Sequence, residues 1–182
     1  MIVQFLFYLI LVYLEGHQLI NDRQYGFRHG RSAGDLLVCL TQRWAAAIEI
    51  LAVSLDIAKA FDRVWHKTLL SKLPSFGLPE SLWTSSFITG RSIRVVIDGY
   101  CSNPKPVNAG VPQGCVLSAT LFLLHINDML DTSNIYCYAD DSTGDAVYTG
   151  HAGLSPEIVD QCRQRLVSSI ESSLEKVAKW GK

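Results

Sequence analysis

Residues 135–141 read Ile-Tyr-Cys-Tyr-Ala-Asp-Asp, a short apolar run that ends on two carboxylates. Such a run of isoleucine and aromatic residues is typical of a buried strand. A second apolar run, residues 51–57 (Leu-Ala-Val-Ser-Leu-Asp-Ile), also leads to a carboxylate, Asp56. The sequence therefore predicts two strands whose ends present Asp56 and the pair Asp140 and Asp141.

The segments around these strands follow helical and extended patterns in turn. Helices are expected over 35–50, over 58–73, after Pro79, over 117–130 and from Pro156 almost to the C-terminus. Residues 22–34 have the composition of a loop, and 146–149 are a candidate return strand. The dipeptide Asp98-Gly99 predicts a hairpin between 93–97 and 100–107. The pattern as a whole is α+β, in a single domain.

Residues 2–14 (Ile-Val-Gln-Phe-Leu-Phe-Tyr-Leu-Ile-Leu-Val-Tyr-Leu) form the most apolar segment. As a helix this segment would span about 20 Å, less than the roughly 30 Å hydrocarbon core of a membrane. No basic residues precede it, and no small-residue cleavage site follows it. A buried core element is favoured; an interface with a partner segment and a membrane or signal element are the alternatives.

Composition limits the class of protein without naming a function. Of the 182 residues, 48% are hydrophobic and 18% are charged, and the net charge is −1, which excludes collagen-like, coiled-coil and disordered chains. The five cysteines form no Cys-x-x-Cys pair, which argues against a zinc site and a disulfide framework. A nucleic-acid-binding domain that acts alone usually carries a stronger basic excess.

The carboxylates at the strand ends have two interpretations. Clustered acids repel one another unless their pKa values rise or a hard divalent cation binds them. Mg²⁺ suits such a cluster because it needs only one or two carboxylates, together with waters and substrate phosphates. The alternative is that Asp140 and Asp141 merely cap and solvate a turn.

Four motifs, taken together, favour the metal-binding interpretation. Residues 55–62 (Leu-Asp-Ile-Ala-Lys-Ala-Phe-Asp) resemble the first catalytic motif of reverse transcriptases, in particular those of LINE-type (non-LTR) retrotransposons. Residues 109–118 resemble the second palm motif of that family, and residues 138–141 (Tyr-Ala-Asp-Asp) resemble its metal-binding hairpin. Residues 24–32 are similar to the fingers motif. The four occur in the family's order, and the overall resemblance is to Jockey-like elements.

The resemblance implies the palm of a right-hand polymerase with partial fingers, an antiparallel sheet backed by helices. Residues 1–50 would be a remnant of the fingers and residues 51–182 the palm. The family's catalytic carboxylates match Asp56, Asp140 and Asp141. Asp56 and Asp140 would hold two Mg²⁺ ions, for which Mn²⁺ could substitute, and the backbone carbonyl of Ile57 would also reach a metal.

The resemblance also assigns residues that contact the substrate. Phe61 matches an aromatic gate that would exclude the ribose 2′-hydroxyl; an ordinary aromatic residue of the core is the alternative. Gln113 and Gly114 fall in the loop that would line the nascent base pair, where a glycine permits close approach of the backbone. Arg28 and Arg31 match a fingers loop in which a guanidinium could hold a phosphate or the template backbone; ordinary solvated arginines are the alternative.

The expected function is RNA-directed DNA synthesis, with an RNA template, a DNA primer and a dNTP as partners. Because the family's primer grip and thumb are not found in the sequence, the chain is expected to be a fragment. The alternatives are an inactive remnant that at most binds nucleic acid, and a membrane protein with incidental motif matches. No membrane partner is expected. The oligomeric state and the location are left open, and an intracellular location, nuclear or cytoplasmic, is expected.

Overall fold

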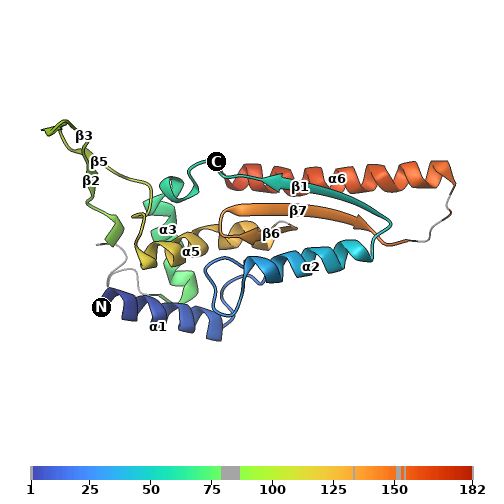
Figure 1. Cartoon of the computed structure of the whole chain (residues 1–182), viewed down its shortest axis with the longest axis horizontal. Coiled ribbons are helices and arrows are strands. Elements are labelled where there is room, and N and C mark those ends of the chain that lie inside the picture. Colours follow the sequence, from blue (N-terminus) through green and yellow to red (C-terminus); the bar gives the residue numbers. More distant parts are fainter. Residues whose placement is uncertain (1, 79–86, 133, 151–152, 154, 182) are drawn as a thin grey trace. The chain divides into compact units, whose positions relative to one another are not determined.

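A computed structural model describes residues 2–78, 87–132, 134–150, 153 and 155–181. The chain is a mixture of helices and antiparallel strands (Figure 1), as the α+β pattern predicted. It forms two compact units, the first made of Met1–Leu19 and Ala58–His125 and the second of Ile20–Ile57 and Ile126–Lys182. The division at residue 50 between fingers and palm stays a prediction.

The second unit is built around a three-stranded sheet. Strands β1 (Glu49–Leu55), β7 (Asp141–Tyr148) and β6 (Ile135–Tyr138) lie in the order β1-β7-β6, and both pairs are antiparallel. Both predicted Asp-tipped strands are confirmed as β1 and β6. The return strand, β7, begins at Asp141 rather than at residue 146, so it is long enough to pair with both neighbours.

Helices cover both faces of this sheet. Helix α6 (Pro156–Trp180) packs on β7 and β1, whereas α2 (Ala33–Ala45) lies on the opposite side (Figure 1). Alternation along β7 explains this arrangement, because successive side chains point to opposite faces of a strand. Gly144 faces Ile170 of α6, while Asp145 is bound by Arg43 of α2.

Helices α2 and α6 begin at residues that favour the start of a helix, but α2 ends earlier than the sequence predicted. Ser32 and Asp35 form a capping box at the start of α2, and Ser155 with Pro156 precedes α6 as predicted. The predicted helix over 35–50 was too long, since α2 ends at Ala45. Strand pairing overrides helical periodicity here: Glu49 begins β1 and pairs with Tyr148.

The first unit contains the apolar N-terminal segment. Helix α1 (Ile2–Gly16) buries Ile10 and Leu14, which agrees with a core element, and leaves Leu9 and Val12 about half exposed. None of the helices in the described part of the chain is long and apolar enough to cross a membrane.

Residues 58–73 are more broken than the single predicted helix. A short 3₁₀ helix, η1 (Ala60–Arg63), is followed by α3 (His66–Lys72) and a second 3₁₀ turn, η2 (Leu73–Phe76), which contains Pro74. The interruption has a tertiary cause: Trp65 forms a β-bridge with Ala109. The helix expected after Pro79 falls largely on residues 79–86, outside the described residues.

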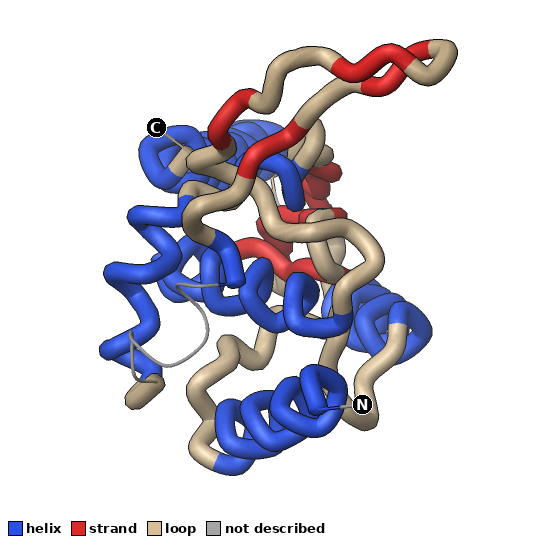
Figure 2. The backbone as a smooth tube through the Cα atoms, turned by 90° about the vertical axis from the view of Figure 1, so that its left-hand side faces the viewer, coloured by secondary structure: helices blue, strands red, loops and turns tan. Residues whose placement is uncertain are grey.

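A thin two-stranded hairpin follows. Strand β2 (Ser92–Ile93) pairs with β5 (Lys105–Pro106), and β3 (Val96–Ile97) pairs with β4 (Tyr100–Cys101) around Asp98-Gly99 (Figure 2). Asp98 and Gly99 both have positive φ, as the favoured two-residue turn requires. This part of the sequence prediction is confirmed.

Helix α5 (Val116–Thr132) follows the hairpin and is apolar on nearly all sides. In the second unit its last turns contribute Met129 and Leu130 to a core cluster with Ile135 and Cys137 of β6. Leu55, Val177 and Trp180 pack against this cluster. The end of β1, which leads into Asp56, is therefore anchored by buried side chains.

Candidate catalytic site

The end of β1 and the β6–β7 hairpin bring the predicted carboxylates to one end of the sheet. Leu55, the last residue of β1, pairs with Ser142, so Asp56 follows this pair and Asp141 precedes it. Asp140 is the second residue of the two-residue loop between β6 and β7. Asp56 and Asp141 are exposed and Asp140 is half-buried. The antiparallel register thus places Asp56 at the same accessible end of the sheet as the adjacent pair Asp140 and Asp141, which lies far from it in sequence.

The donors at this end suit a hard divalent cation that is shared with a substrate. Within the described residues, no group of three or more His, Cys, Asp or Glu side chains surrounds a common metal position. Mg²⁺ often takes one or two protein carboxylates and completes its shell with waters and phosphates. Asp56 and Asp140 supply carboxylates of this kind at one end of the sheet, and their predicted use as metal ligands, with the carbonyl of Ile57, stays a prediction.

The hairpin loop that carries Asp140 has an unusual backbone conformation. Ala139, the first loop residue, has a φ of 58°. Two-residue hairpin loops of the favoured classes need positive φ at this position, which glycine, asparagine or aspartate usually supplies. For alanine the left-handed region costs about 1–2 kcal/mol. The surrounding contacts must hold the loop in this shape.

Those contacts come from residues 23–26, part of the predicted loop. The amide N–H of Tyr25 donates to the carbonyl of Cys137 at 2.8 Å, and the N–H of Cys137 donates to the carbonyl of Arg23 at 2.8 Å. The segment thereby extends the sheet along the free edge of β6. The buried side chain of Gln24 bonds both backbone groups of Ala139.

The two arginines of the fingers motif are occupied within their own loop. Arg28, whose side chain is buried, donates to the carbonyl of Asn21 at 3.1 Å. Arg31 forms an ion pair with Asp22, at 2.6 Å between Nη2 and Oδ1. Both side chains therefore help to hold the loop in this structure, and their predicted contact with phosphate or template stays a prediction.

Tyr25 is the centre of a smaller contact group in the same loop. The guanidinium of Arg31 lies 5.1 Å from the centre of its ring. A hydrogen bond with Cys39, followed by burial, raises the pKa of Tyr25 to about 12. The phenol therefore stays protonated at neutral pH.

Phe61, Gln113 and Gly114 lie in the first unit, where the loop of the second motif contacts η1. The ring of Phe61 stacks on Phe122 with centroids 4.5 Å apart. The N–H of Val111 donates to the carbonyl of Phe61 at 3.0 Å, which ties this loop to η1. Gly114 has a φ of 78°, and a Cβ added to it would meet no neighbouring atom within 4 Å.

A buried ion pair in the second unit was not predicted. The side chain of Asp145 in β7 is fully buried and accepts two hydrogen bonds from Arg43, at 3.2 and 3.1 Å. The indole N–H of Trp44 donates a third bond at 2.9 Å. These bonds fix α2 to the face of the sheet. The only sequence signal was a charged residue inside an apolar strand, which rarely stays buried without a partner.

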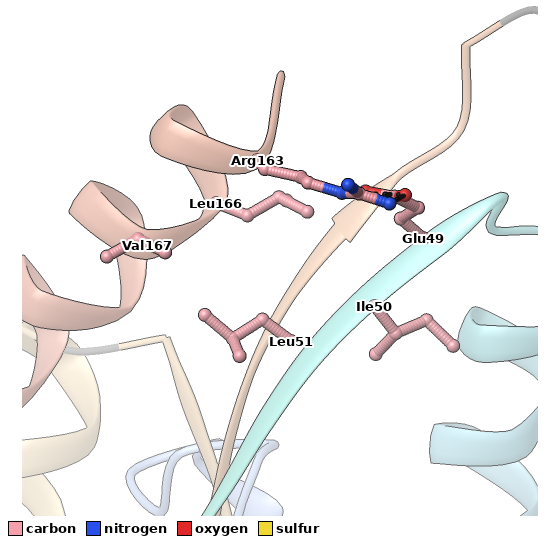
Figure 3. Close-up of a pocket in the computed structure, with 6 residues that line it drawn as sticks. All are labelled: Glu49, Ile50, Leu51, Arg163, Leu166 and Val167. Carbon is pink, nitrogen blue, oxygen red and sulfur yellow. Dashed lines mark hydrogen bonds and ion pairs between the residues drawn. The ribbon is translucent and has the colours of Figure 1, made fainter. Parts of the chain in front are cut away.

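A separate open pocket of about 440 Å³ lies between β1 and α6. Figure 3 shows the apolar side chains of Leu51 and Leu166 below an ion pair between Glu49 and Arg163. The Arg163 guanidinium holds the pKa of the Glu49 carboxyl below its usual range. Glu49 begins β1, whereas Asp56 follows its end, so the pocket is not the carboxylate site.

Comparison with protein families identifies the family of the chain. The family model for reverse transcriptase (RNA-dependent DNA polymerase) matches residues 5–177. The chain belongs to the reverse transcriptase family. The resemblance inferred from the four motifs is therefore confirmed, and in this reverse transcriptase chain the matched span includes the sheet and every predicted site residue.

Several mobile-element proteins are similar to this reverse transcriptase chain. It is 40% identical over 111 residues, 58% of its length, to the RNA-directed DNA polymerase from mobile element jockey of Drosophila melanogaster. It is 35% identical over 128 residues, 68% of its length, to a probable RNA-directed DNA polymerase from transposon BS of the same species. The match to a probable RNA-directed DNA polymerase from transposon X-element is 33% over 130 residues, 66% of the chain.

These relatives confirm the resemblance to Jockey-like elements. The relatives are much longer proteins: the matched part of the chain spans 12% of the jockey protein and 14% of each of the other two.

Proposed function

We propose that this chain catalyses RNA-directed DNA synthesis, with Asp56, Asp140 and Asp141 as the catalytic carboxylates. The observation that supports the proposal most strongly is the pairing of Leu55 with Ser142, from which the three carboxylates follow at one end of the sheet. In this reaction the primer 3′-hydroxyl attacks the α-phosphorus of a dNTP and pyrophosphate leaves.

The carboxylates act by holding divalent cations against the reacting phosphate. Asp56 and Asp140 would bind two Mg²⁺ or Mn²⁺ ions, with the carbonyl of Ile57 as a further ligand and Asp141 as an accessory carboxylate. When bound, such ions lower the pKa of the primer hydroxyl and neutralise charge on the triphosphate. The exposed position of Asp56 and Asp141 leaves room for the waters and phosphates that complete a Mg²⁺ shell.

The remaining predicted residues select and orient the substrates. Phe61 would exclude the ribose 2′-hydroxyl, and its stacking on Phe122 supports this role by fixing the plane of its ring. Gln113 and Gly114 would line the nascent base pair. Arg28 and Arg31 would contact template or phosphate, directly or through the shape of the loop that they hold. In this scheme residues 1–50 are a fingers remnant and 51–182 the palm.

Extension of an oligo(dT) primer on poly(A) RNA, with Mg²⁺ and dTTP, tests the proposal. Asp140→Ala should reduce synthesis to background while the fold survives. Asp160→Ala, which removes an exposed carboxylate from α6, should leave synthesis unchanged and serves as the matched control. Undiminished synthesis by Asp140→Ala would exclude these carboxylates as the catalytic ones.

The alternative is a catalytically inactive remnant that at most binds nucleic acid. A folded chain that extends no primer would support it. Under this alternative Asp56→Asn should leave any metal-free binding to an RNA–DNA hybrid unchanged. Mg²⁺-dependent nucleotide incorporation separates the two functions, and fluorescence anisotropy measures the metal-free binding.

A further inference from the structure

The side chain of Gln24 is enclosed almost completely, with only 1% of the residue exposed. Its amide makes three hydrogen bonds. Oε1 accepts from the N–H of Gly26 at 2.8 Å and from the N–H of Ala139 at 2.9 Å, and Nε2 donates to the carbonyl of Ala139 at 3.1 Å. Both backbone groups of one hairpin residue are thus bound by one side chain.

The residue that Gln24 binds is the one whose conformation sets the direction of the loop. Ala139 has positive φ and directly precedes Asp140, the second and last loop residue. An alanine leaves the left-handed region easily unless neighbouring groups oppose the change. Rotation about φ or ψ of Ala139 would break the bonds to Gln24 and would also move the Cα of Asp140.

Gly26 allows the backbone of Ala139 to lie close to residues 24–26. A Cβ on Gly26 would lie 2.1 Å from the nitrogen and 2.8 Å from the Cα of Ala139. Because Gly26 does not have positive φ, it is the lack of space, and not the backbone conformation, that excludes a side chain there. The Gln-Tyr-Gly sequence at 24–26 therefore combines an amide that binds the loop with a glycine that lets the loop come close.

We propose that Gln24 is a positioning residue: it fixes the Ala139 turn and thereby the carboxylate of Asp140 at the metal-binding end of the sheet. The role given to Asp140 depends on the proposed function. The fold itself has other supports, since the backbone bonds between residues 23–25 and Cys137 and the β6–β7 ladder do not involve the Gln24 side chain. Removal of the amide should therefore loosen the turn more than the sheet.

Two substitutions of Gln24 remove different sets of its three hydrogen bonds. Gln24→Met keeps the length of the side chain and removes all three bonds, whereas Gln24→Glu keeps an acceptor for the two N–H groups and loses the donor to the carbonyl of Ala139. Trp44→Phe is the matched control, because it removes a part-buried hydrogen bond to Asp145 in β7, the strand that follows the turn, without touching the turn itself. If Gln24→Met does not fold, Gln24→Asn, which keeps the amide but shortens the side chain by one methylene group, provides the test.

The first measurement is amide hydrogen exchange of Ala139 by NMR on the ¹⁵N-labelled full chain, without metal or nucleic acid. Loss of the bond from the Ala139 N–H should accelerate its exchange about tenfold or more in Gln24→Met. Trp44→Phe should leave that exchange rate as it is. Unchanged exchange of Ala139 in Gln24→Met would overturn the proposal.

The second measurement is line broadening of the Asp140 and Asp141 amide signals during titration with Mn²⁺. Gln24→Met should require about tenfold more Mn²⁺ for half-maximal broadening, and Gln24→Glu an intermediate amount. If the turn loosens while the Mn²⁺ response matches that of Trp44→Phe, Gln24 is structural only and the proposal fails.

Neither measurement depends on DNA synthesis, so failure of the chain to extend a primer leaves this test intact. Absence of broadening in the unsubstituted chain would count against the proposed metal site itself. In that case the exchange of Ala139 alone decides whether Gln24 holds the turn.

Discussion

Substitution of Arg43 or Asp145 tests how much their buried ion pair contributes to the stability of the second unit. Asp145 is fully buried, whereas the side chain of Arg43 is 34% exposed. Three hydrogen bonds converge on the carboxylate, two from Arg43 and one from Trp44. The hydrogen bond with Asp145 also raises the pKa of Arg43, so this guanidinium stays charged. Removal of Arg43 would leave a buried carboxylate, whereas removal of Asp145 would leave a guanidinium that is partly exposed to water.

Because the two side chains differ in burial, substitutions of Arg43 and of Asp145 should lower the free energy of unfolding by different amounts. Removing one partner of a buried pair costs about 3–5 kcal/mol when the remaining charge is fully enclosed. Arg43→Met leaves the enclosed carboxylate with only the bond from Trp44, so its cost should lie in that range. Asp145→Ala leaves a guanidinium that water can reach, and its cost should be smaller, about 2–3 kcal/mol. Asp145→Asn keeps an acceptor and should cost about 1–2 kcal/mol.

Urea denaturation followed by tryptophan fluorescence and circular dichroism measures these losses in the full chain. Glu49→Gln is the control, because it breaks a solvent-exposed ion pair with Arg163 and should change the free energy of unfolding much less. An Arg43→Met loss no larger than that of Glu49→Gln would refute the reasoning. A larger loss for Asp145→Ala than for Arg43→Met would contradict the argument from unequal burial.

Three further predictions concern other parts of the chain. Gly26→Ala should destabilise the second unit by about 1–3 kcal/mol in urea denaturation, because the added Cβ would overlap the backbone of Ala139; an unchanged midpoint would show that the loop moves aside freely. Phe61→Ala should increase the ratio of ribonucleotide to deoxynucleotide incorporation in an active preparation, and an unchanged ratio would remove Phe61 as the gate. Burial raises the pKa of the Cys137 thiol from 9.0 to about 11, so the unfolded chain ionises first and stability should fall as pH rises between these values. Cys137→Ala should reduce that slope, and an identical slope in both proteins would contradict the assignment.

Local patterns were sufficient for the elements whose signals lie within a few residues. Asp98-Gly99 predicts its own turn because both residues tolerate positive φ, and Ser155-Pro156 predicts the start of α6. The Asp-tipped strands at 51–57 and 135–141 were predictable because a buried strand is a short apolar run. The end of α2 was not, because Ile48 and Ile50 suit a helix or a strand equally and the partner, β7, decides.

For the carboxylate site, the motifs predicted which residues matter but not how they are held. The antiparallel register that pairs Leu55, just before Asp56, with Ser142, just after Asp141, joins segments far apart in the sequence, which local patterns cannot specify. Gln24 belonged to the fingers motif, yet its residue type gave no indication that its amide would bind Ala139. The ion pair of Asp145 was equally unpredictable from the sequence, since Arg43 comes close to it only in the folded chain.

The alanine at position 139 explains why the turn needs the hydrogen bonds from Gln24. Glycine would adopt the positive φ without strain, but a glycine loop would also sample other conformations. Alanine at this φ costs about 1–2 kcal/mol, and two net hydrogen bonds at about 1 kcal/mol each are enough to offset it. Gln24 forms two such bonds with Ala139. A strained residue bound at both backbone groups gives a single loop conformation, and for the metal-binding role proposed for Asp140 a single conformation is more useful than an unstrained flexible one.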